Sequence, residues 1–396
     1  MFSERLKQLR LARGLTLQAL SAQLGGIVTK QALSKYESGK IMPSPVVMSR
    51  IAQVLGVKAA HLLSEPKISV RFVAYRKLSG LIKRDRTRLE SLISHELEQR
   101  TQLLEKVDKL QPIDIPVEQM GIRNLNDTET VAEKIRSRWC LGSDPIGNLM
   151  GSIEDQLIHI MEIPADNKFD GLSAVATDED DRTVAAAIVT RAGLCGERQR
   201  LNIAHELGHL ILKIPKSVNE EKAAFRFGSA LLAPASSIFQ NVGTSRDFLH
   251  IEELLLLKKR FGISIQAILY RLRDLKIISD QYYRQWCITI NRSGWRRREP
   301  GEMESEKPQW LLQTVLHALS EGFITHDQAE KYLGSTLLAD APLPSMDRRA
   351  FLKLPLEQRR KAIVDQASRL VNYYSKASDI RDLPPGEIFE YEGSKS

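Results

Sequence analysis

His205 and His209 are four residues apart and enclose Glu206 in the pattern H-E-x-x-H. On a helix, side chains four residues apart share one face, so both imidazoles can reach the same metal ion. Glu206 lies beside them and can hold the water that a metal polarises. Apolar residues around the motif indicate a buried helix, which favours a zinc site over a coincidental pair of helical histidines.

A catalytic zinc ion needs a third protein ligand. No third histidine follows closely, and the next acidic residues, Glu220 and Glu221, come at the start of a further predicted helix. Either could be the ligand, because both fit the pattern E-x-x-A with Ala223 or Ala224, and such small residues let two helices approach. The spacing favours Glu221. The alternative for both residues is an acid stabilised by the positive end of a helix dipole.

Residues 81–110 are highly charged, and their apolar residues mostly recur every three or four positions, which predicts a helix. We expect it to pack on the following domain, because four regular heptads of a coiled coil are absent. Within it, His95 precedes Glu96 but has Gln99, not a second histidine, four residues on. We therefore interpret His95 as part of a solvated helix surface.

The positive charge of the chain gathers near the N-terminus. Residues 1–66 contain nine basic and three acidic residues, a net charge of +6, whereas the whole 396-residue chain carries +8. Such density in one compact domain points to a polyanion, with nucleic acid as the first candidate and a merely soluble basic surface as the alternative. The same residues read as short helices, two of which begin after the capping residues Thr16 and Thr29.

The composition also limits the cellular setting. The three cysteines, Cys140, Cys195 and Cys287, lie far apart and form no CxxC motif, which favours a reducing cytosol. No apolar run approaches the roughly 18 residues of a membrane span, and the first residues do not resemble a signal peptide. We therefore expect a cytoplasmic protein without a membrane partner.

The middle of the chain predicts a small sheet among helices. Short apolar runs at 157–163, 172–177 and 184–189 are joined by short turns, which suggests a small antiparallel sheet. Helical patterns follow at 199–212, 220–232, 248–260, 264–274 and 279–286. The expected fold class is mainly α with an α+β middle.

Short motifs surround the two histidines and continue toward the C-terminus. They are Glu197-Arg198-Gln199-Arg200, Glu221-Lys222, Arg226-Phe227, Leu231-Leu232-Ala233-Pro234, Phe169-Asp170-Gly171-Leu172-Ser173 and Leu269-Tyr270-Arg271. With these motifs, residues from about 130 to 275 resemble the ImmA/IrrE zinc metallopeptidases. Residues 1–64 resemble the XRE-type helix-turn-helix. Gly294-Trp295-Arg296 and Glu299-Pro300 are similar to the extension found where these two domains are fused.

The resemblance implies a domain order. The expected segments are an all-α helix-turn-helix domain over 1–66, a helical linker over 67–115, a zincin-like peptidase domain over 116–280, a helical extension over 281–345, and a tail helix over 346–396. The tail weakly resembles small antitoxin-like proteins, so it is either a partner-binding element or a helix that caps the peptidase.

The resemblance also implies roles for individual residues. The zinc ligands are His205, His209 and Glu221, since the third ligand of the family precedes the motif phenylalanine, here Phe227, by six residues. Glu206 is the general base. Phe225 stands where a polar residue is usual, and Gly228 where alanine is common. Tyr270 and Arg271 are candidates for stabilising the oxyanion, with helix packing and a surface ion pair as the alternative.

DNA reading is expected from the second helix of the helix-turn-helix pair, whose N-terminal residues enter the major groove. Gln18, at the start of the preceding helix, would contact phosphate. Glutamine can pair with adenine, and lysine can reach guanine or phosphate. Such domains often dimerise to read two half-sites, so we expect a homodimer. The candidate base-reading residues are Thr29, Lys30, Gln31, Ser34 and Lys35.

Together these features predict a transcriptional regulator that binds double-stranded DNA and contains a Zn²⁺-dependent endopeptidase. The expected substrate is a specific partner protein of repressor or antitoxin type, cleaved in a stress or mobile-element response. It could add as a strand to the edge of the small sheet, with 169–173 as a wall of the cleft. The alternatives are a non-proteolytic transcription factor or antitoxin with a structural or sensory zinc site, and hydrolysis of a non-peptide substrate. The intact Glu206 argues against a purely structural site.

Overall fold

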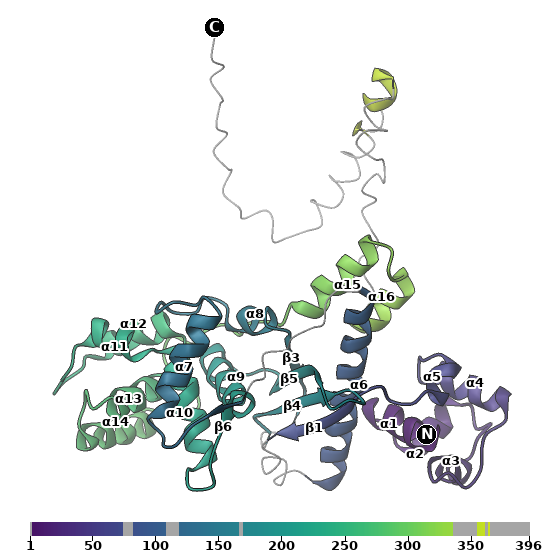
Figure 1. Ribbon diagram of the computed structural model, residues 1–396, viewed down its shortest axis with the longest axis horizontal. Coiled ribbons are helices and arrows are strands. Elements are labelled where there is room, and N and C mark those ends of the chain that lie inside the picture. Colours follow the sequence, from purple (N-terminus) through teal and green to yellow (C-terminus); the bar gives the residue numbers. More distant parts are fainter. Residues whose placement is uncertain are drawn as a thin grey trace. The chain divides into compact units, whose positions relative to one another are not determined.

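The computed structural model of the protein describes residues 2–73, 82–107, 119–165, 169–335, 355–360 and 363–364 (Figure 1). The chain divides into two compact units, Met1–Gln328 and Ala329–Ser396. The features analysed below all lie in the first unit. The predicted partner-binding tail over 346–396 falls almost entirely outside the described residues. No helix in the described part of the chain is both long and apolar enough to cross a membrane.

The N-terminal residues form a bundle of five short helices. The hydroxyl groups of Thr16 and Thr29 accept hydrogen bonds from backbone amides, so both predicted capping residues begin helices as expected. Leucine and isoleucine side chains fill the centre of the bundle. The helices are α1 (Phe2–Ala12), α2 (Leu17–Gln23), α3 (Lys30–Glu37), α4 (Pro45–Val54) and α5 (Ala59–Leu63).

The segment after this bundle differs from the expected helical linker. It contains β1 (Ser69–Val73) as well as the helix α6 (Lys83–Val107). β1 pairs antiparallel with β4 (Gly171–Thr177) of the central sheet, with Ser69 opposite Thr177 and Val73 opposite Ser173. The strand is only five residues long, so its alternation was too short to stand out from the charged sequence around it.

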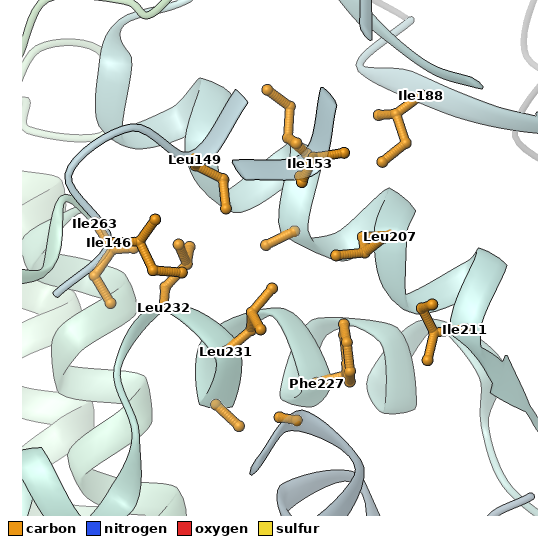
Figure 2. Packing of buried hydrophobic residues seen from close by; sticks show 14 of the residues in the cluster. Ile146, Leu149, Ile153, Ile188, Leu207, Ile211, Phe227, Leu231, Leu232 and Ile263 are labelled. Atoms are coloured by element: carbon orange, nitrogen blue, oxygen red, sulfur yellow. The ribbon is translucent and has the colours of Figure 1, made fainter. Parts of the chain in front are cut away.

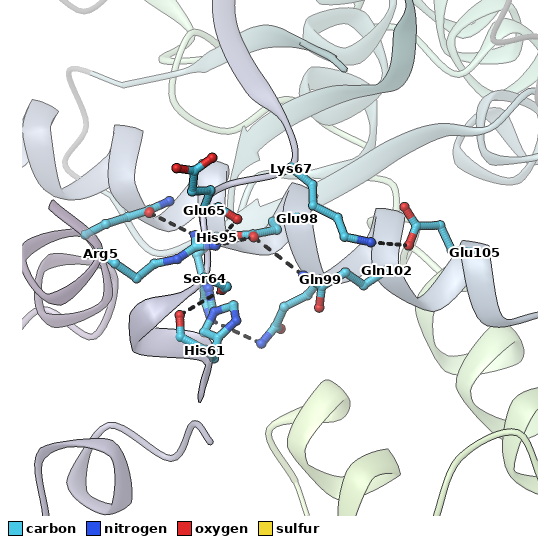
Figure 3. A network of polar contacts seen from close by, with 11 residues as sticks. Arg5, His61, Ser64, Glu65, Lys67, His95, Glu98, Gln99, Gln102 and Glu105 are labelled. Atoms are coloured by element: carbon cyan, nitrogen blue, oxygen red, sulfur yellow. Dashed lines mark hydrogen bonds and ion pairs between the residues drawn. The ribbon is translucent and has the colours of Figure 1, made fainter. Parts of the chain in front are cut away.

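A buried ion pair joins α1 to α6. The two terminal guanidinium nitrogens of Arg5, Nη1 and Nη2, donate to the carboxylate of Glu98, at 2.6 and 2.5 Å (Figure 3). His95 lies in the same place, only 7% exposed, with its ring centroid 6.5 Å from that of His61 on α5. The interpretation of His95 as solvated surface was therefore wrong. Its face of α6 is covered by the N-terminal bundle, which a pattern within one helix cannot reveal.

The central sheet has four strands in the order β1-β4-β5-β3. The three predicted strands are present as β3 (Ile158–Ile163), β4 and β5 (Thr183–Arg191). The pairing of β4 with β5 is antiparallel, but β3 runs parallel to β5, so the sheet is mixed rather than purely antiparallel. The chain passes from β3 to the far side of β5 before it forms β4. β3 and β4, although consecutive in sequence, are therefore not neighbours in the sheet. A second, two-stranded sheet pairs β2 (Met120–Gly121) with β6 (Leu212–Lys213).

Helices α9 (Gly196–Ile211) and α10 (Glu220–Leu232) pack side by side, and α9 also packs against β4 and β5 of the sheet. Leu207 and Ile211 of α9 meet Phe227 and Leu231 of α10, while Ile188 of β5 covers them from the other side (Figure 2). The other helices are α7 (Asp127–Arg138), α8 (Leu149–Glu154), α11 (Ala235–Val242), α12 (Ile251–Phe261), α13 (Ile265–Asp274), α14 (Asp280–Arg292), α15 (Trp310–Ser320) and α16 (His326–Leu333).

Two glycines let the backbones of α9 and α10 approach closely. A Cβ atom at Gly208 would lie 3.1 Å from the Cα of Ala224, and one at Gly228 would lie 3.0 Å from the backbone carbon of Ala204. Larger residues at either position would push the helices apart. The expectation that small residues bring these two helices together agrees with this contact.

The segment after α14 is fastened to the start of α9. The side chain of Glu197 accepts from the amide of Met303 at 3.1 Å, and Gln199 accepts from the amide of Glu306 at 2.8 Å. Lys258 donates to Glu197 at 2.7 Å and to Glu299 at 3.0 Å. The motif Glu197-Arg198-Gln199-Arg200 thus attaches the extension to the helix that carries the histidines.

Gly228→Val should lower the free energy of unfolding by about 2 kcal/mol, because its side chain meets the backbone of α9. Urea denaturation of the full chain measures this loss. Gln240→Val, at an exposed position of α11, is the matched control and should cost only a few tenths of a kcal/mol. Equal stability of the two variants would contradict the role assigned to the close helix contact.

Candidate metal centre

His205 and His209 present their imidazoles on one face of α9, as the four-residue spacing requires. Their Nε2 atoms are 3.2 Å apart, and both side chains are buried. Two imidazole nitrogens this close to each other can serve as two of the ligands of one metal ion. The apolar faces of α9 and α10 pack around the pair.

Glu221 completes the set from the first turn of α10. Its Oε2 atom lies 3.3 Å from Nε2 of His205, and its Oε1 atom lies 3.5 Å from Nε2 of His209. The ligand atoms of all three residues lie within 4.8 Å of one another. Two histidine nitrogens and one carboxylate oxygen are a donor set that suits zinc. The residues present therefore fit the metal that the sequence predicts.

The structure distinguishes Glu220 from Glu221, the two candidates for the third ligand that the sequence left open. Asn219 caps α10 by accepting from the amide of Lys222 at 2.9 Å, which places Glu220 and Glu221 in the first helical turn. Glu221 faces the Nε2 atoms, whereas Oε1 of Glu220 lies 3.3 Å from Nδ1 of His209. These two atoms form no hydrogen bond, so Glu220 lies beside the ring as a nearby negative charge. From the sequence, Glu220 was only an alternative zinc ligand or an acid stabilised by the helix dipole.

Glu206 is buried and held by the neighbouring strand. The hydroxyl of Ser173 donates to Oε2 of Glu206 at 3.0 Å and is also 2.8 Å from its backbone oxygen. Gly171 leaves room for this side chain, because a Cβ there would lie 3.2 Å from Cγ of Glu206. The motif at 169–173 was identified only as a cleft wall; its serine and glycine position the carboxylate.

The outer side of β4 is already paired in this structure. β1 lies along it from Ser173 to Thr177. A substrate strand cannot add to that part of β4 while β1 remains in place, so the idea that substrate adds to the sheet is restricted to β4 residues before Ser173 or to another edge.

An open cavity of about 350 Å³ adjoins Glu221, one of the three ligand residues. Glu221, with 51% of its side chain exposed, lies in its wall. Phe225 lies there too, and its ring centroid is 4.1 Å from that of His205. Tyr270 also lines this cavity, so it shares the space with Glu221; its role in stabilising an oxyanion stays a prediction.

Arg271 does not reach this cavity. Its guanidinium is fully buried and donates to both carboxylate oxygens of Glu129 on α7, at 2.5 and 2.7 Å, and to the backbone oxygen of Ala233 at 3.0 Å. All three nitrogens are used in joining α13 to α7 and to the end of α10. The prediction that Arg271 stabilises an oxyanion is therefore wrong, and the alternative of packing and ion pairing describes it, although the pair is buried.

The six candidate DNA-binding residues all lie on the exposed side of α2 and α3. Gln18 is in the first turn of α2. Thr29 caps α3, Lys30 and Gln31 lie in its first turn, and Ser34 and Lys35 lie in its second half. Thr29 is both a candidate DNA contact and the cap of α3, because its hydroxyl accepts a hydrogen bond from the amide of Ala32. The side chains of Lys30, Gln31, Ser34 and Lys35 are exposed, as base or phosphate contacts require.

A second cluster of histidines and an acid, formed by His61, His95 and Glu98, is arranged differently. Its ligand atoms also lie within 4.8 Å of one another. Both oxygens of Glu98 accept from Arg5, however, so the carboxylate already neutralises a guanidinium. We therefore treat this cluster as part of the contact between α1, α5 and α6.

Comparison with known families defines the class of protein. Residues 6–62 match the helix-turn-helix family model, and residues 154–273 match the model for the IrrE N-terminal-like domain of peptidase family M78. The protein thus joins an XRE-type helix-turn-helix domain to an IrrE-like peptidase domain. All ligand candidates and Glu206 fall within the second match, and all six DNA-binding candidates within the first.

One similar curated protein is the "SPbeta prophage-derived uncharacterized HTH-type transcriptional regulator YonR" of Bacillus subtilis (strain 168). The two are 38% identical over 63 residues, which are 16% of this chain and 56% of the relative. The similarity therefore spans little more than half of that regulator and a small part of this protein.

Glu129→Gln should lower the free energy of unfolding by about 3 kcal/mol at neutral pH, because it leaves the buried Arg271 without its counter-charge. Burial alone would raise the pKa of Glu129, but the hydrogen bonds and charges of Arg271 and Arg226 hold it below its usual 4.5. The stabilisation is present above pH 4.5 and is lost as the pH falls through the lower folded value.

Urea denaturation between pH 7 and pH 3 measures this difference. The stability of wild type and Glu129→Gln should converge at the acid end. Glu133→Gln, an exposed position on the same helix, is the control and should follow wild type throughout. A gap between wild type and Glu129→Gln that does not change with pH would contradict the assigned ion pair.

Proposed function

We propose that this protein is a cytoplasmic, DNA-binding regulator whose second domain is a zinc-dependent endopeptidase. The observation that carries the proposal is the convergence of His205, His209 and Glu221 within 4.8 Å, with Glu206 on the same helix. The match to a peptidase family over the residues that form this set supports the same function.

The chemistry follows from the donor set and from the placement of Glu206. His205, His209 and Glu221 would hold zinc, which supplies the Lewis acidity that activates water near neutral pH. Glu206 accepts the proton of the attacking water and can pass it to the leaving amine. Ser173 keeps the carboxylate oriented for both transfers. Tyr270, in the wall of the adjoining cavity, is the candidate donor to the developing oxyanion.

Access to the ligand residues supports catalysis over a structural role. Structural zinc sites are closed by four protein ligands, whereas catalytic sites keep one position open. Here only three ligand residues are brought together, and one of them, Glu221, lines an open cavity with half of its side chain exposed. A buried carboxylate beside the set has no use in a purely structural site.

The substrate in this proposal is a specific partner protein of repressor or antitoxin type, cleaved in a stress or mobile-element response. The prophage origin in the name of the similar Bacillus regulator is consistent with a mobile-element setting. The N-terminal domain would bind double-stranded DNA as a homodimer, with α3 in the major groove.

Wild-type protein should bind about one zinc per chain, and His205→Ala and Glu221→Ala should lose it, because each removes one of three ligands. Glu206→Gln should keep the metal but lower peptide cleavage by at least about 100-fold, since the base is absent. Metal analysis of the purified protein gives the first result. Mass spectrometry of a mixed peptide library gives the second.

Glu252→Gln, on the surface of α12, is the matched control for both measurements. Undiminished cleavage by Glu206→Gln would overturn the mechanism. Zinc binding without any cleavage would leave the non-proteolytic regulator with a sensory site as the better description.

Gln31→Ala should weaken binding to the selected DNA site by about 1–3 kcal/mol and relax the preference at one base position. Lys35→Ala should instead weaken binding to all sequences about equally. It should also reduce the slope of log affinity against log salt concentration by about one, because one phosphate contact is lost. Selection from random duplexes followed by fluorescence anisotropy at several salt concentrations measures both. Lys58→Ala, a basic residue of the same domain outside α2 and α3, is the control. Identical base preferences in wild type and Gln31→Ala would contradict the assignment.

A further inference from the structure

The cavity beside the ligand residue Glu221, here called the apolar chamber, is mainly hydrophobic. Its walls come from α9, α10, α13 and α14, so four helices shape a space of about 350 Å³. A volume of this size accommodates one large side chain. The residues that give the chamber its character are Leu201, Phe225, Ala267, Tyr270 and Tyr283.

The aromatic walls of the apolar chamber are held in place. Tyr270 and Tyr283 meet edge to face with their centroids 6.0 Å apart, and the guanidinium of Arg273 lies over both rings at 4.1 and 4.6 Å. Burial raises the pKa of Tyr283 to about 12, so this wall is uncharged at neutral pH. Phe225 is 44% exposed, which is unusual for so large an apolar side chain beside a polar centre.

A second cavity, here called the arginine chamber, adjoins the first. It has a volume of about 620 Å³ and shares Leu201, Ser264 and Gln266 with the apolar chamber. The shared walls make the two cavities successive parts of one cleft that starts at Glu221. The basic residues of the arginine chamber are Arg191, Arg198, Arg296, Arg297 and Arg298.

The arginine chamber keeps uncompensated positive charge. Asp170 lies 2.9 Å from Arg198 and 3.9 Å from Arg191, and Glu302 lies 3.4 Å from Arg298. Arg296 and Arg297 are exposed and have no acidic partner among the residues that the structure describes.

Two acids in the wall of the arginine chamber are already in use. Glu197 and Glu299 are bound to Lys258, so they do not neutralise the arginines. The chamber therefore favours an anionic ligand.

We propose that the two chambers together are the cleft that selects the substrate of the metal centre. The apolar chamber takes a bulky apolar side chain next to the scissile bond, and the arginine chamber takes acidic side chains further along the same segment. This inference rests on the proposed peptidase function and names its substrate class. A peptide fits better than a nucleic acid, because the arginine chamber is concave, partly lined by acids and continuous with apolar walls.

Hydroxamates test the apolar chamber directly, since they chelate zinc and so anchor a side chain beside the metal. Zinc-loaded full-length protein is titrated calorimetrically with hydroxamates that carry glycine, leucine or phenylalanine side chains, on either side of the chelating group. The leucine and phenylalanine compounds of one series should bind at least about tenfold more tightly than the glycine compound, as burial of a large apolar side chain requires.

Ala267→Phe reduces the volume of the apolar chamber from α13, which carries no ligand residue, and Ala267→Leu is the milder version. Both should abolish the preference for large side chains while zinc content and glycine hydroxamate affinity stay unchanged. Phe248→Ala, an exposed aromatic that lines neither chamber, is the matched control. Equal affinities for all three side chains in zinc-bound wild type would overturn this half of the inference.

The arginine chamber is tested by extending the tightest hydroxamate with four aspartate or four serine residues. The acidic compound should bind about tenfold more tightly at low salt, and the double variant Arg296→Ser with Arg297→Ser should remove that advantage. Binding of the glycine hydroxamate should not change. Displacement of the acidic peptide by duplex DNA, or an equal affinity for the serine peptide, would overturn this half. Absence of zinc from wild type would overturn the proposed function itself, a result that metal analysis separates from the others.

Discussion

The metal centre depends on the backbone contact between α9 and α10, because its ligands come from both helices. His205 and His209 belong to one helix and Glu221 to the other, so their distance is set by how closely the helices approach. Gly208 and Gly228 allow an approach that any side chain would prevent. The apolar faces around them supply the favourable free energy that offsets burying two imidazoles. Packing and site geometry are thus one property of the same pair of helices.

Buried ion pairs hold the surrounding elements in fixed positions. Arg271 joins α13 to α7 through Glu129, and Lys258 joins α12 to α9 and to the extension through Glu197 and Glu299. Burial alone would lower the pKa of Lys258, but hydrogen bonds to its two acids raise it, so the lysine stays charged. Such pairs add little net stability, because desolvation opposes the attraction, yet a mispaired arrangement would leave a buried charge alone. They restrict the helices to one arrangement around the cleft.

The sequence was sufficient to locate functional residues where these lie within one short local pattern. The four-residue spacing located His205 and His209, and the caps Thr16 and Thr29 located the helices that carry the DNA-facing residues. The motif containing Arg271 was located too, but its role was not, since its partner Glu129 is 142 positions away.

Contacts between distant segments escaped sequence analysis for the same reason. β1 was missed because its strand pairing is with residues a hundred positions on, and His95 because the surface that covers it belongs to another domain. The parallel pairing of β3 depends on strand order, which no local period encodes.

β1 gives the sheet a covalent connection to the DNA-facing domain that is only five residues long, from Leu63 at the end of α5 to Ser69. At its other end, Val73 is paired with Ser173, whose hydroxyl holds Glu206. One strand therefore connects the N-terminal helices to the serine that holds the carboxylate beside the histidines. If occupation of the cleft shifted β1 and so changed the affinity of the N-terminal domain for its ligand, that ligand would change the affinity of the cleft by the same factor.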